Sequence, residues 1–515
     1  MPDPTIRRPL VVASVMAALF MIAIEATIVS TAMPQIAGQL GDLHLYSWVF
    51  SSFLLTQTAT TVVFGKLSDL YGRKPVLIVG IAIFLLGSIL CGLAWSIPSL
   101  IAFRLLQGVG AGAIQPVSLT IVGDLYPANQ RGKIQGWLAS VWGISSVLGP
   151  LAGGLIIQHL SWAWVFWINI PVGIAACWGF WRFLREDVST QSRHVDTTGA
   201  ALFTVSIAAL MLALTWLGTE SYGPATAAGT VFLVGGILFV LQELRARDPM
   251  IAFALWARRP IATANAATLL SGMTIIGLTT FLPMYVQGVL GQSAMVAGFA
   301  LTMMVLGWPI GATTAARIFP KFGLRRTLLL GGALLPIGGI AFTLLAPGSS
   351  PILAGAGSTI IGLGMGFLST SAIVIIQDSV GWTERGAATA SNIFSRNLGS
   401  TLGATILGAI LNYSLAHHAP GTETVAFDQI RQLLDHAGAL AVGHAGALAV
   451  GHAGALATGN AGNPGLLAAD AAIRNALAHA LHITFWAVFL IALATLLVAL
   501  LVPTVKLARV SEPAE

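Results

Sequence analysis

Charged residues are scarce in this chain of 515 residues. They make up 9% of the sequence, against 56% for hydrophobic residues, whereas soluble domains carry roughly a quarter of their residues as charges. This balance excludes a single soluble core. The chain also lacks a GxxxxGK[ST] sequence and a recognisable nucleophile–base constellation, so neither nucleotide use nor an enzyme is expected.

Cysteine is almost absent as well. The two cysteines, Cys91 and Cys177, each lie within a long apolar stretch. Cysteines in such positions predict no disulfide framework and no metal site. The sequence therefore gives no reason to expect a cofactor.

Long hydrophobic stretches recur along the chain, and stretches of about 20 residues can cross a hydrocarbon core of ~30 Å as helices. They predict an all-α polytopic membrane protein. The fourteen expected spans are 10–33, 47–64, 76–95, 98–122, 134–157, 163–183, 199–217, 224–242, 261–285, 294–316, 325–346, 351–376, 389–413 and 481–502. The first span follows Arg7 and Arg8 without a small-residue cleavage site, so we expect it to be retained as an anchor.

Basic residues are distributed unevenly between the two sides of these spans. With a cytoplasmic N-terminus, nearly all of the 25 Lys and Arg residues fall in cytoplasmic segments, and Arg385 and Arg396 are counted among them. Arg104 is the only basic residue expected within a helix core. This positive-inside pattern predicts a multi-pass protein of the cytoplasmic (inner) membrane with both termini in the cytoplasm. The net charge of +6 then reflects topology and does not indicate nucleic-acid binding.

The chain contains an internal repeat. Shifting the sequence by 254 residues aligns "GVGAGAIQPVSLTIVGDLYPANQRG" from Gly108 with "GLGMGFLSTSAIVIIQDSVGWTERG" from Gly362. The matched positions are Gly108, Gly110, Gly112, Asp124, Arg131, Gly132 and Gly149 with Gly362, Gly364, Gly366, Asp378, Arg385, Gly386 and Gly403. Such repeats are common in transporters. We therefore expect two six-helix halves, at 1–183 and 261–515, with two inserted helices and their flanking loops at 184–260.

Charge is concentrated in "GKLSDLYGRKP", from Gly65 to Pro75. This stretch is expected to form a short cytoplasmic loop, in which Gly65 and Gly72 permit tight turns. Asp69 is then available to a helix N-terminus or to an arginine. The second half has "ARIFPKFGLRR" at the matching place, with Pro320 instead of Asp69. An ordinary solvated positive-inside loop is the alternative interpretation.

The same stretch resembles the signature loop of the major facilitator superfamily. Further stretches are similar to the fourteen-helix drug:proton antiporters of the QacA/EmrB type, namely "IEATIVSTAMPQI", "RLLQGVGAG", "GISSVLGPLAGG", "WVFWINIPVG" and "RGAATASNIFSRNLGSTLG". The resemblance spans the chain except for 414–480. It implies a major facilitator fold with 14 transmembrane helices.

The resemblance also implies roles for residues at the cytoplasmic side. Asp69 is expected to dock on the first turn of a helix in the opposite half, while Arg73 pairs with Asp124. With Gly65 and Gly72, these residues would form a conformational latch that closes the cytoplasmic side. A charge–dipole contact of this kind contributes about 0.3 to 2 kcal/mol, which biases two states without locking one.

Four residues of the fifth helix are expected to form the kink associated with antiporters. They are Gly149, Pro150, Gly153 and Gly154. Glycines let another helix approach closely, and proline removes a backbone hydrogen bond and bends the helix. Generic close packing explains the glycines equally well.

Two charged residues fall inside apolar stretches and are the candidates for proton coupling. Glu25 lies between Ile24 and Ala26, and a carboxylate in a membrane helix must be protonated, paired or wet. It is interpreted as a proton carrier, where the related family usually has Asp. Arg104 is expected to tune its proton affinity through a polar network. The alternatives are an acid near the external helix end that water reaches and an interfacial snorkelling arginine.

Two other features receive less weight. Asp378 ends the twelfth helix and is either a second proton site or, more plainly, a helix-end acid near Arg385. The external loop 414–480 contains three "HAGALAxG" octads, from His436 to Gly459. Eight residues separate the imidazoles by about 12 Å in a helix and about 26 Å in a strand, so repeat expansion is favoured over a metal site.

These observations lead to one functional hypothesis and its alternatives. The chain is expected to be a proton-coupled secondary transporter that exports lipophilic drugs or amphiphiles by alternating access. Its partners would be a small lipophilic substrate, H⁺ and membrane lipids, with a periplasmic adaptor as an optional addition. The alternatives are a dedicated exporter of a natural lipid, siderophore or metabolite, and a non-transporting membrane sensor.

Overall fold

The computed structural model describes residues 8–40, 46–186, 196–218, 221–246, 253–292, 294–417 and 464–504. Within these residues the secondary structure is helical. The elements are α1 Arg8–Leu40, α2 Tyr46–Tyr71, α3 Arg73–Gly92, α4 Ile97–Leu125, α5 Ala128–His159, α6 Trp164–Trp167, α7 Asn169–Phe183, α8 Thr197–Gly218, α9 Tyr222–Arg245, α10 Phe253–Trp256, α11 Arg259–Met284, η2 Tyr285–Val289, α12 Ala294–Phe322, α13 Leu324–Thr343, α14 Pro351–Asp378, η3 Trp382–Glu384, α15 Arg385–His417 and α17 Pro464–Leu500.

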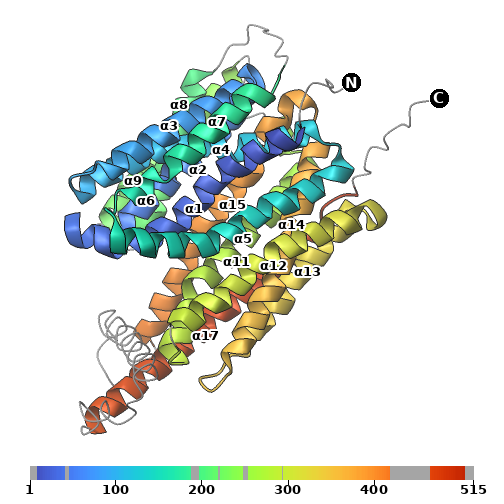
Figure 1. The fold of residues 1–515 in the computed structure, drawn as a ribbon. Coiled ribbons are helices and arrows are strands. Elements are labelled where there is room, and N and C mark those ends of the chain that lie inside the picture. The colour runs from blue at the N-terminus through green and yellow to red at the C-terminus, as the bar shows by residue number, and fades with distance from the viewer. Residues whose placement is uncertain are drawn as a thin grey trace.

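The long helices form two groups that pack side by side (Figure 1). In the first group, α1 packs on α4, α5 and α7, while α4 packs on α2 and α3. In the second, α14 packs on α12 and α13, while α11 and α17 pack on α15. Contacts of α5 with α12 and of α2 with α15 join the groups. Helices α8 and α9 pack against each other, and α8 also contacts α2 and α15.

Glycines of the internal repeat perform the same packing in both groups. Gly108 on α4 has no room for a side chain because the backbone of α2 lies against it, and Gly110 is equally close to α3. Their repeat partners on α14 behave alike, since Gly362 lies against α12 and Gly364 against α13. Small residues allow helix backbones to approach in a membrane. The repeated sequence therefore encodes a repeated three-helix contact.

Twelve helical stretches of the described residues are long and apolar enough to span a membrane. They include α1, α3, α4 and the combined α6 and α7. Helices α2 and α5 are equally long but fall outside this group, because Ser, Thr, Gln and Gly interrupt their apolar runs. Both of these more polar helices take part in the contact between the two groups.

The cytoplasmic loop expected at 65–75 is almost entirely helical, which corrects the sequence prediction. Helix α2 continues to Tyr71 and α3 begins at Arg73, so Gly72 alone separates them. Gly72 has a positive φ of 94°, a conformation that favours glycine. Gly65 forms no turn. It lies within α2, where the nearby Ala390 of α15 leaves no room for a side chain.

The C-terminal part also differs from expectation. The last helix, α17, begins at Pro464 and not at 481, because alanine and leucine in "PGLLAADAAIRNALAHAL" favour helix as strongly as the apolar span does. The three octads from His436 to Gly459 lie outside the described residues.

Candidate functional site

The centre of the first helix group contains a buried ion pair. Arg104 of α4 donates from Nη1 to Oε1 of Glu25 on α1, with a distance of 2.5 Å between the two atoms. Glu25 is 0% exposed and Arg104 is 2% exposed. The two charges are therefore enclosed by the surrounding helices and paired with each other.

Neutral polar groups complete this site. Arg104 Nη1 also donates to Gln107 Oε1 at 2.7 Å, and Arg104 Nε donates to the carbonyl of Val49 at 3.1 Å. The guanidinium lies over the ring of Phe53, 4.3 Å from its centroid. Such cation–π contacts suit a desolvated arginine. The positive charge therefore has partners on α2 as well as on α1 and α4.

Asn169 is a member of the site that the sequence interpretation missed. Its Nδ2 donates to the second carboxylate oxygen of Glu25, Oε2, at 2.5 Å. Asn169 begins α7 and is fully buried. It is part of "WVFWINIPVG", which contributed to the family resemblance, but a neutral amide inside an apolar stretch gives no sign of its partner. Both oxygens of Glu25 are thus held by groups on other helices.

A second cluster of charges joins the two helix groups at one end of the molecule. Asp69 of α2 accepts hydrogen bonds from the backbone N–H groups of Gly386 and Ala387, at 2.9 and 2.8 Å. These N–H groups belong to the first turn of α15, where the helix dipole favours negative charge. Arg73 Nη2 donates to the same carboxylate at 2.8 Å. The arrangement places Asp69 at a helix N-terminus of the other group.

Asp124 links two arginines from different groups. Its Oδ2 accepts from Arg73 Nε at 3.0 Å, and its Oδ1 accepts from Arg385 Nη1 at 2.6 Å. Arg73 is 2% exposed and also lies over the ring of Trp382, 4.1 Å from the centroid. Its Nη2 further donates to the Trp382 carbonyl at 2.7 Å. Arg385 and Trp382 were not predicted for this role, since neither is part of the charged stretch at 65–75.

Burial has a marked effect on the carboxyl group of Asp69. Desolvation raises the pKa of Asp69 to about 7, although Arg73 and the N–H groups of Ala387 and Gly386 act in the opposite direction. Burial thus opposes the charged form of Asp69, while its hydrogen-bond and ion-pair partners favour it.

The glycines of α5 pack inside the first helix group. Gly149 lies against Thr27 of α1 with no space for a side chain, and Thr27 Oγ1 donates to the carbonyl of Ser145 on α5 at 3.1 Å. Gly153 is buried, and Gly153, Gly154 and Pro150 all lie within the continuous helix α5. Contacts of α5 with the other group come earlier in the helix, where Gly132 and Gly136 lie against α12.

Asp378 stands at the C-terminal end of α14 and is partly buried. Its carboxylate interacts electrostatically with Arg131 of α5. Arg385, the neighbour expected from the sequence, is instead hydrogen-bonded to Asp124. Of these repeated residues, Arg385 thus forms an ion pair with Asp124 of the other group, whereas Arg131 Nε donates to the carbonyl of Tyr126.

Arg396 is placed differently from the sequence prediction. It was counted with the cytoplasmic residues, although the expected span 389–413 contains it, and the structure places it within α15, eleven residues after Arg385 at the start of that helix. At 1.5 Å per residue, this is about 16 Å along the helix. Arg104 is therefore not the only arginine inside a membrane-spanning helix. A second one occurs in the other helix group.

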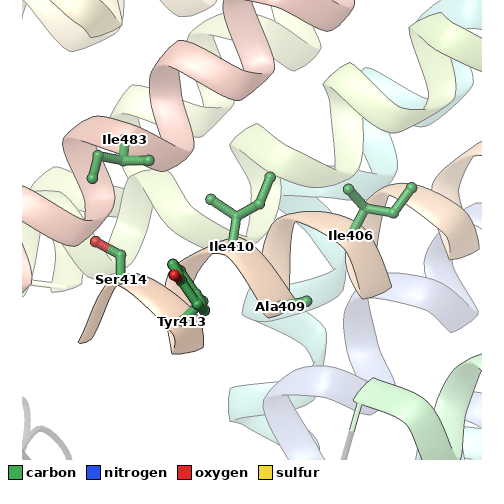
Figure 2. Close-up of a pocket in the computed structure, with 6 residues that line it drawn as sticks. All are labelled: Ile406, Ala409, Ile410, Tyr413, Ser414 and Ile483. Carbon is green, nitrogen blue, oxygen red and sulfur yellow. The ribbon is translucent and has the colours of Figure 1, made fainter. Parts of the chain in front are cut away.

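An apolar groove of about 440 Å³ lies further along α15. It is lined by Ile406, Ala409, Ile410, Tyr413 and Ser414 of α15 and by Ile483 of α17 (Figure 2). The lining has no charged residue and includes none of the predicted site residues. Within the described residues, no group of three or more His, Cys, Asp or Glu side chains could hold a metal ion.

Comparisons with known proteins agree with this architecture. The model of the Major Facilitator Superfamily matches residues 15–404. Multidrug resistance protein 3 of Bacillus subtilis is 37% identical over 404 residues, covering 78% of this chain and 79% of that protein. The multidrug transporter protein MdtP of the same organism is 34% identical over 409 residues, covering 79% and 76% respectively.

A solved structure shares the fold. The crystal structure of the human organic anion transporter MFSD10 (TETRAN) superposes with a TM-score of 0.60, covering 85% of this chain and 98% of that one at 16% sequence identity. At this identity the likeness concerns the fold alone. With the family model, the relatives and the helical architecture taken together, the chain is a multi-pass membrane protein that belongs to the Major Facilitator Superfamily.

Proposed function

We propose that this protein is a proton-coupled exporter of lipophilic drugs or amphiphiles. Relatives that are 34 to 37% identical are named as multidrug resistance and multidrug transporter proteins, which supports efflux as the direction of transport. The observation that carries proton coupling is the buried pair of Glu25 and Arg104. Ionisable residues inside a membrane domain are costly and usually belong to a transport or proton pathway.

The pair offers a simple means of coupling. In the observed arrangement, both oxygens of Glu25 are occupied by Arg104 and Asn169. Protonation of Glu25 removes the negative charge that holds the guanidinium, so the contacts between α1, α4 and α7 change with the charge state. A conformation that exposes Glu25 to one side of the membrane then takes up or releases its proton on that side.

The charge cluster at Asp69 and Asp124 is proposed as the latch between two transport states. It joins α2 and α4 to the start of α15, so it must open when the two halves separate at this end. Charge-assisted hydrogen bonds of this kind contribute about 1.5 to 3 kcal/mol each. The latch therefore favours the observed closed state without preventing the opposite one.

The proposed membrane arrangement has fourteen spans, which adds α2 and α5 to the twelve more apolar stretches. Both are long enough to cross the membrane, and shielding by neighbouring helices accounts for their more polar sequences. Residues 1–183 and 261–515 would act as the two moving halves, with 184–260 as an insert. Both termini would lie in the cytoplasm and the membrane would be the cytoplasmic one. In Figure 1, α1 begins and α17 ends at the same end of the bundle.

The test is transport by purified protein in liposomes under an imposed pH gradient. Three fluorescent lipophilic dyes are compared, one cationic, one neutral and one anionic, in the wild type and in Glu25→Gln. Glu384→Gln is the control, because Glu384 is 41% exposed and pairs with Arg258 at the surface. We expect dye accumulation by the wild type and the control only. Equal accumulation by Glu25→Gln would show that another residue couples transport to protons. If no dye accumulates in any protein, export of lipophilic compounds is rejected in favour of a dedicated substrate.

A further inference from the structure

Arg396 on α15 has a positive charge without a partner in the part of the chain that the structure describes. Among the described residues, its side chain makes no hydrogen bond, ion pair or ring contact. The residue is partly buried. The guanidinium nitrogens of Arg396 are not among the fully enclosed polar atoms that lack a hydrogen-bond partner, whereas the hydroxyl oxygens of Ser118 and Ser371 are. The head group is thus available to a molecule from outside the chain.

The side chain lies on the face of α15 that is turned to the inside of the bundle. Thr389 and Asn392 precede Arg396 by seven and four residues, and residues at these spacings share one helix face. Thr389 Oγ1 accepts from Gln377 of α14 at 3.2 Å, and Asn392 Nδ2 donates to Thr268 of α11 at 2.9 Å. The face therefore looks toward α11 and α14 and not toward lipid.

The neighbouring helices provide no counter-charge at this depth. Helices α2, α4, α8, α11, α14 and α17 pack against α15, and their sequences contain a carboxylate only near their ends. These carboxylates are Asp69, Asp124, Asp378 and Asp470. The first two contact the start of α15, which is about 16 Å from Arg396 along the helix. A guanidinium without a carboxylate inside a membrane domain is unfavourable unless an anion or water reaches it.

We infer that Arg396 binds the anionic head group, a carboxylate, phosphate or sulfonate, of an amphiphile that enters the bundle. Arginine recognises these groups through two parallel N–H donors. The residues one and two turns from Arg396 on the same face, Thr389, Asn392 and Ser400, are neutral polar groups. The inference rests on the proposed export of amphiphiles and adds that the preferred amphiphile is negatively charged.

The test uses two probes that differ only in charge, a dansyl-labelled alkyl sulfonate and the matching methyl sulfone. The sulfonate stays ionised at all working pH values. Binding is followed by dansyl fluorescence with the full chain in nanodiscs of phosphatidylcholine. We expect the wild type to bind the sulfonate about 10- to 100-fold more tightly than the sulfone. Arg396→Gln should lose this preference and bind the sulfone as the wild type does.

Arg317→Gln is the matched control, because Arg317 is an exposed arginine of α12 and its removal changes the net charge equally. Equal affinity of the wild type for both probes, or a preference that survives in Arg396→Gln, would overturn the inference. If Arg396→Gln no longer binds the sulfone, its fold is damaged. The preference for the sulfonate is then measured with Arg396→Lys instead. Lysine lacks the paired donors, so its preference for the sulfonate must fall several-fold while sulfone binding stays unchanged.

The source of the anion is resolved by adding phosphatidylglycerol to the nanodiscs. If this lipid displaces the sulfonate from the wild type and leaves sulfone binding unchanged, the head group bound at Arg396 is that of a membrane lipid. If it does not, the site takes the anionic group of a transported molecule. Export of both probes under a pH gradient is scored separately. If the wild type exports the probes in a proton-driven manner but binds sulfonate and sulfone equally, only the anion site is rejected. If no variant exports either probe, the proposed function is rejected.

Discussion

The two arginines inside the helical bundle have opposite surroundings. Arg104 is bonded to Glu25, Gln107 and the carbonyl of Val49, whereas Arg396 has no partner among the described residues. Arg104 is the more deeply buried of the two. A buried charge is strongly unfavourable unless it is paired, whereas an accessible charge can remain unpaired until a ligand binds it. This difference fits the two roles that we propose, coupling for Arg104 and recognition for Arg396.

Comparison of the two repeats shows that neither Arg104 nor Arg396 has an arginine at the matching position of the other repeat. Ser358 stands in the second half where the first has Arg104, and its hydroxyl is buried without a partner. Arg396 has Trp142 as its counterpart at the same offset of 254 residues. Each half therefore has its own interior arginine at a position where the other half has none. The shared scaffold supports two different charge sites.

Breaking the Arg104 site should have the largest effect. In Glu25→Ala, the guanidinium stays buried without its carboxylate, and removing one partner of a buried pair costs about 3 to 5 kcal/mol. We expect a matching fall in the free energy of unfolding and a loss of proton-driven transport. Thermal unfolding in detergent, followed by tryptophan fluorescence, measures the first effect.

A double variant sharpens this prediction. Glu25→Gln with Arg104→Gln removes both charges, so no unpaired ion remains and most of the lost stability should return. Transport should not return, because the proton carrier is still missing. Stability that stayed as low as in Glu25→Ala would contradict the view that the unpaired guanidinium causes the loss.

Weakening the latch should have a smaller effect. Asp124→Asn removes the charge shared by Arg73 and Arg385, and the closed state should lose about 1.5 to 3 kcal/mol, or roughly tenfold or more in population. Spin labels at Tyr71 and Phe322, which are exposed at the ends of α2 and α12, report the separation. An unchanged distance distribution would show that this cluster does not hold the halves together.

The latch should also respond to pH. Burial raises the pKa of Asp69 to about 7, above that of an exposed aspartate, so the closed form binds more protons between these two values. The closed contact is then favoured at pH 6 and weakened as the pH rises through 7. The same spin labels should report more opening at pH 8. Asp69→Asn should remove this dependence, and its persistence would assign it to another group.

The smallest effect is expected at Arg396. Because Arg396→Gln breaks no hydrogen bond, ion pair or ring contact with the described residues, the free energy of unfolding should change by no more than about 0.5 kcal/mol. Glu25→Ala, measured under the same conditions, gives the contrast. A loss of several kcal/mol at Arg396 would mean that the arginine stabilises the fold and is not free to bind a ligand.

Part of this arrangement could be predicted from the sequence. Glu25 and Arg104 were recognised because a charge inside an apolar stretch stands out. Asn169 was not, because a neutral amide gives no such contrast. The positive-inside pattern counted Arg396 with the cytoplasmic residues, although it falls within the expected span 389–413 and among polar residues in "ASNIFSRNLGS". In the structure, Ser395 donates to the backbone carbonyl of its own helix, so polar residues continue the helix instead of ending it.

The boundaries of the charged stretch at 65–75 were wrong for a similar reason. Its charges suggested a loop, yet Asp69 and Arg73 are satisfied by each other and by α15, which lets α2 continue to Tyr71. Partners in distant parts of the chain are not visible in local composition. The repeat was more informative, since the glycines at 108–112 and 362–366 revealed it in the sequence and make the same close helix contacts in both groups.

The most direct test of the central claim is proton release upon substrate binding. A dye that the wild type exports is added to purified protein in weakly buffered detergent solution, and the pH change is recorded. If Glu25 is the proton carrier, the wild type exchanges protons when the dye binds and Glu25→Gln does not, although it still binds the dye. Equal proton exchange by both proteins would contradict the account.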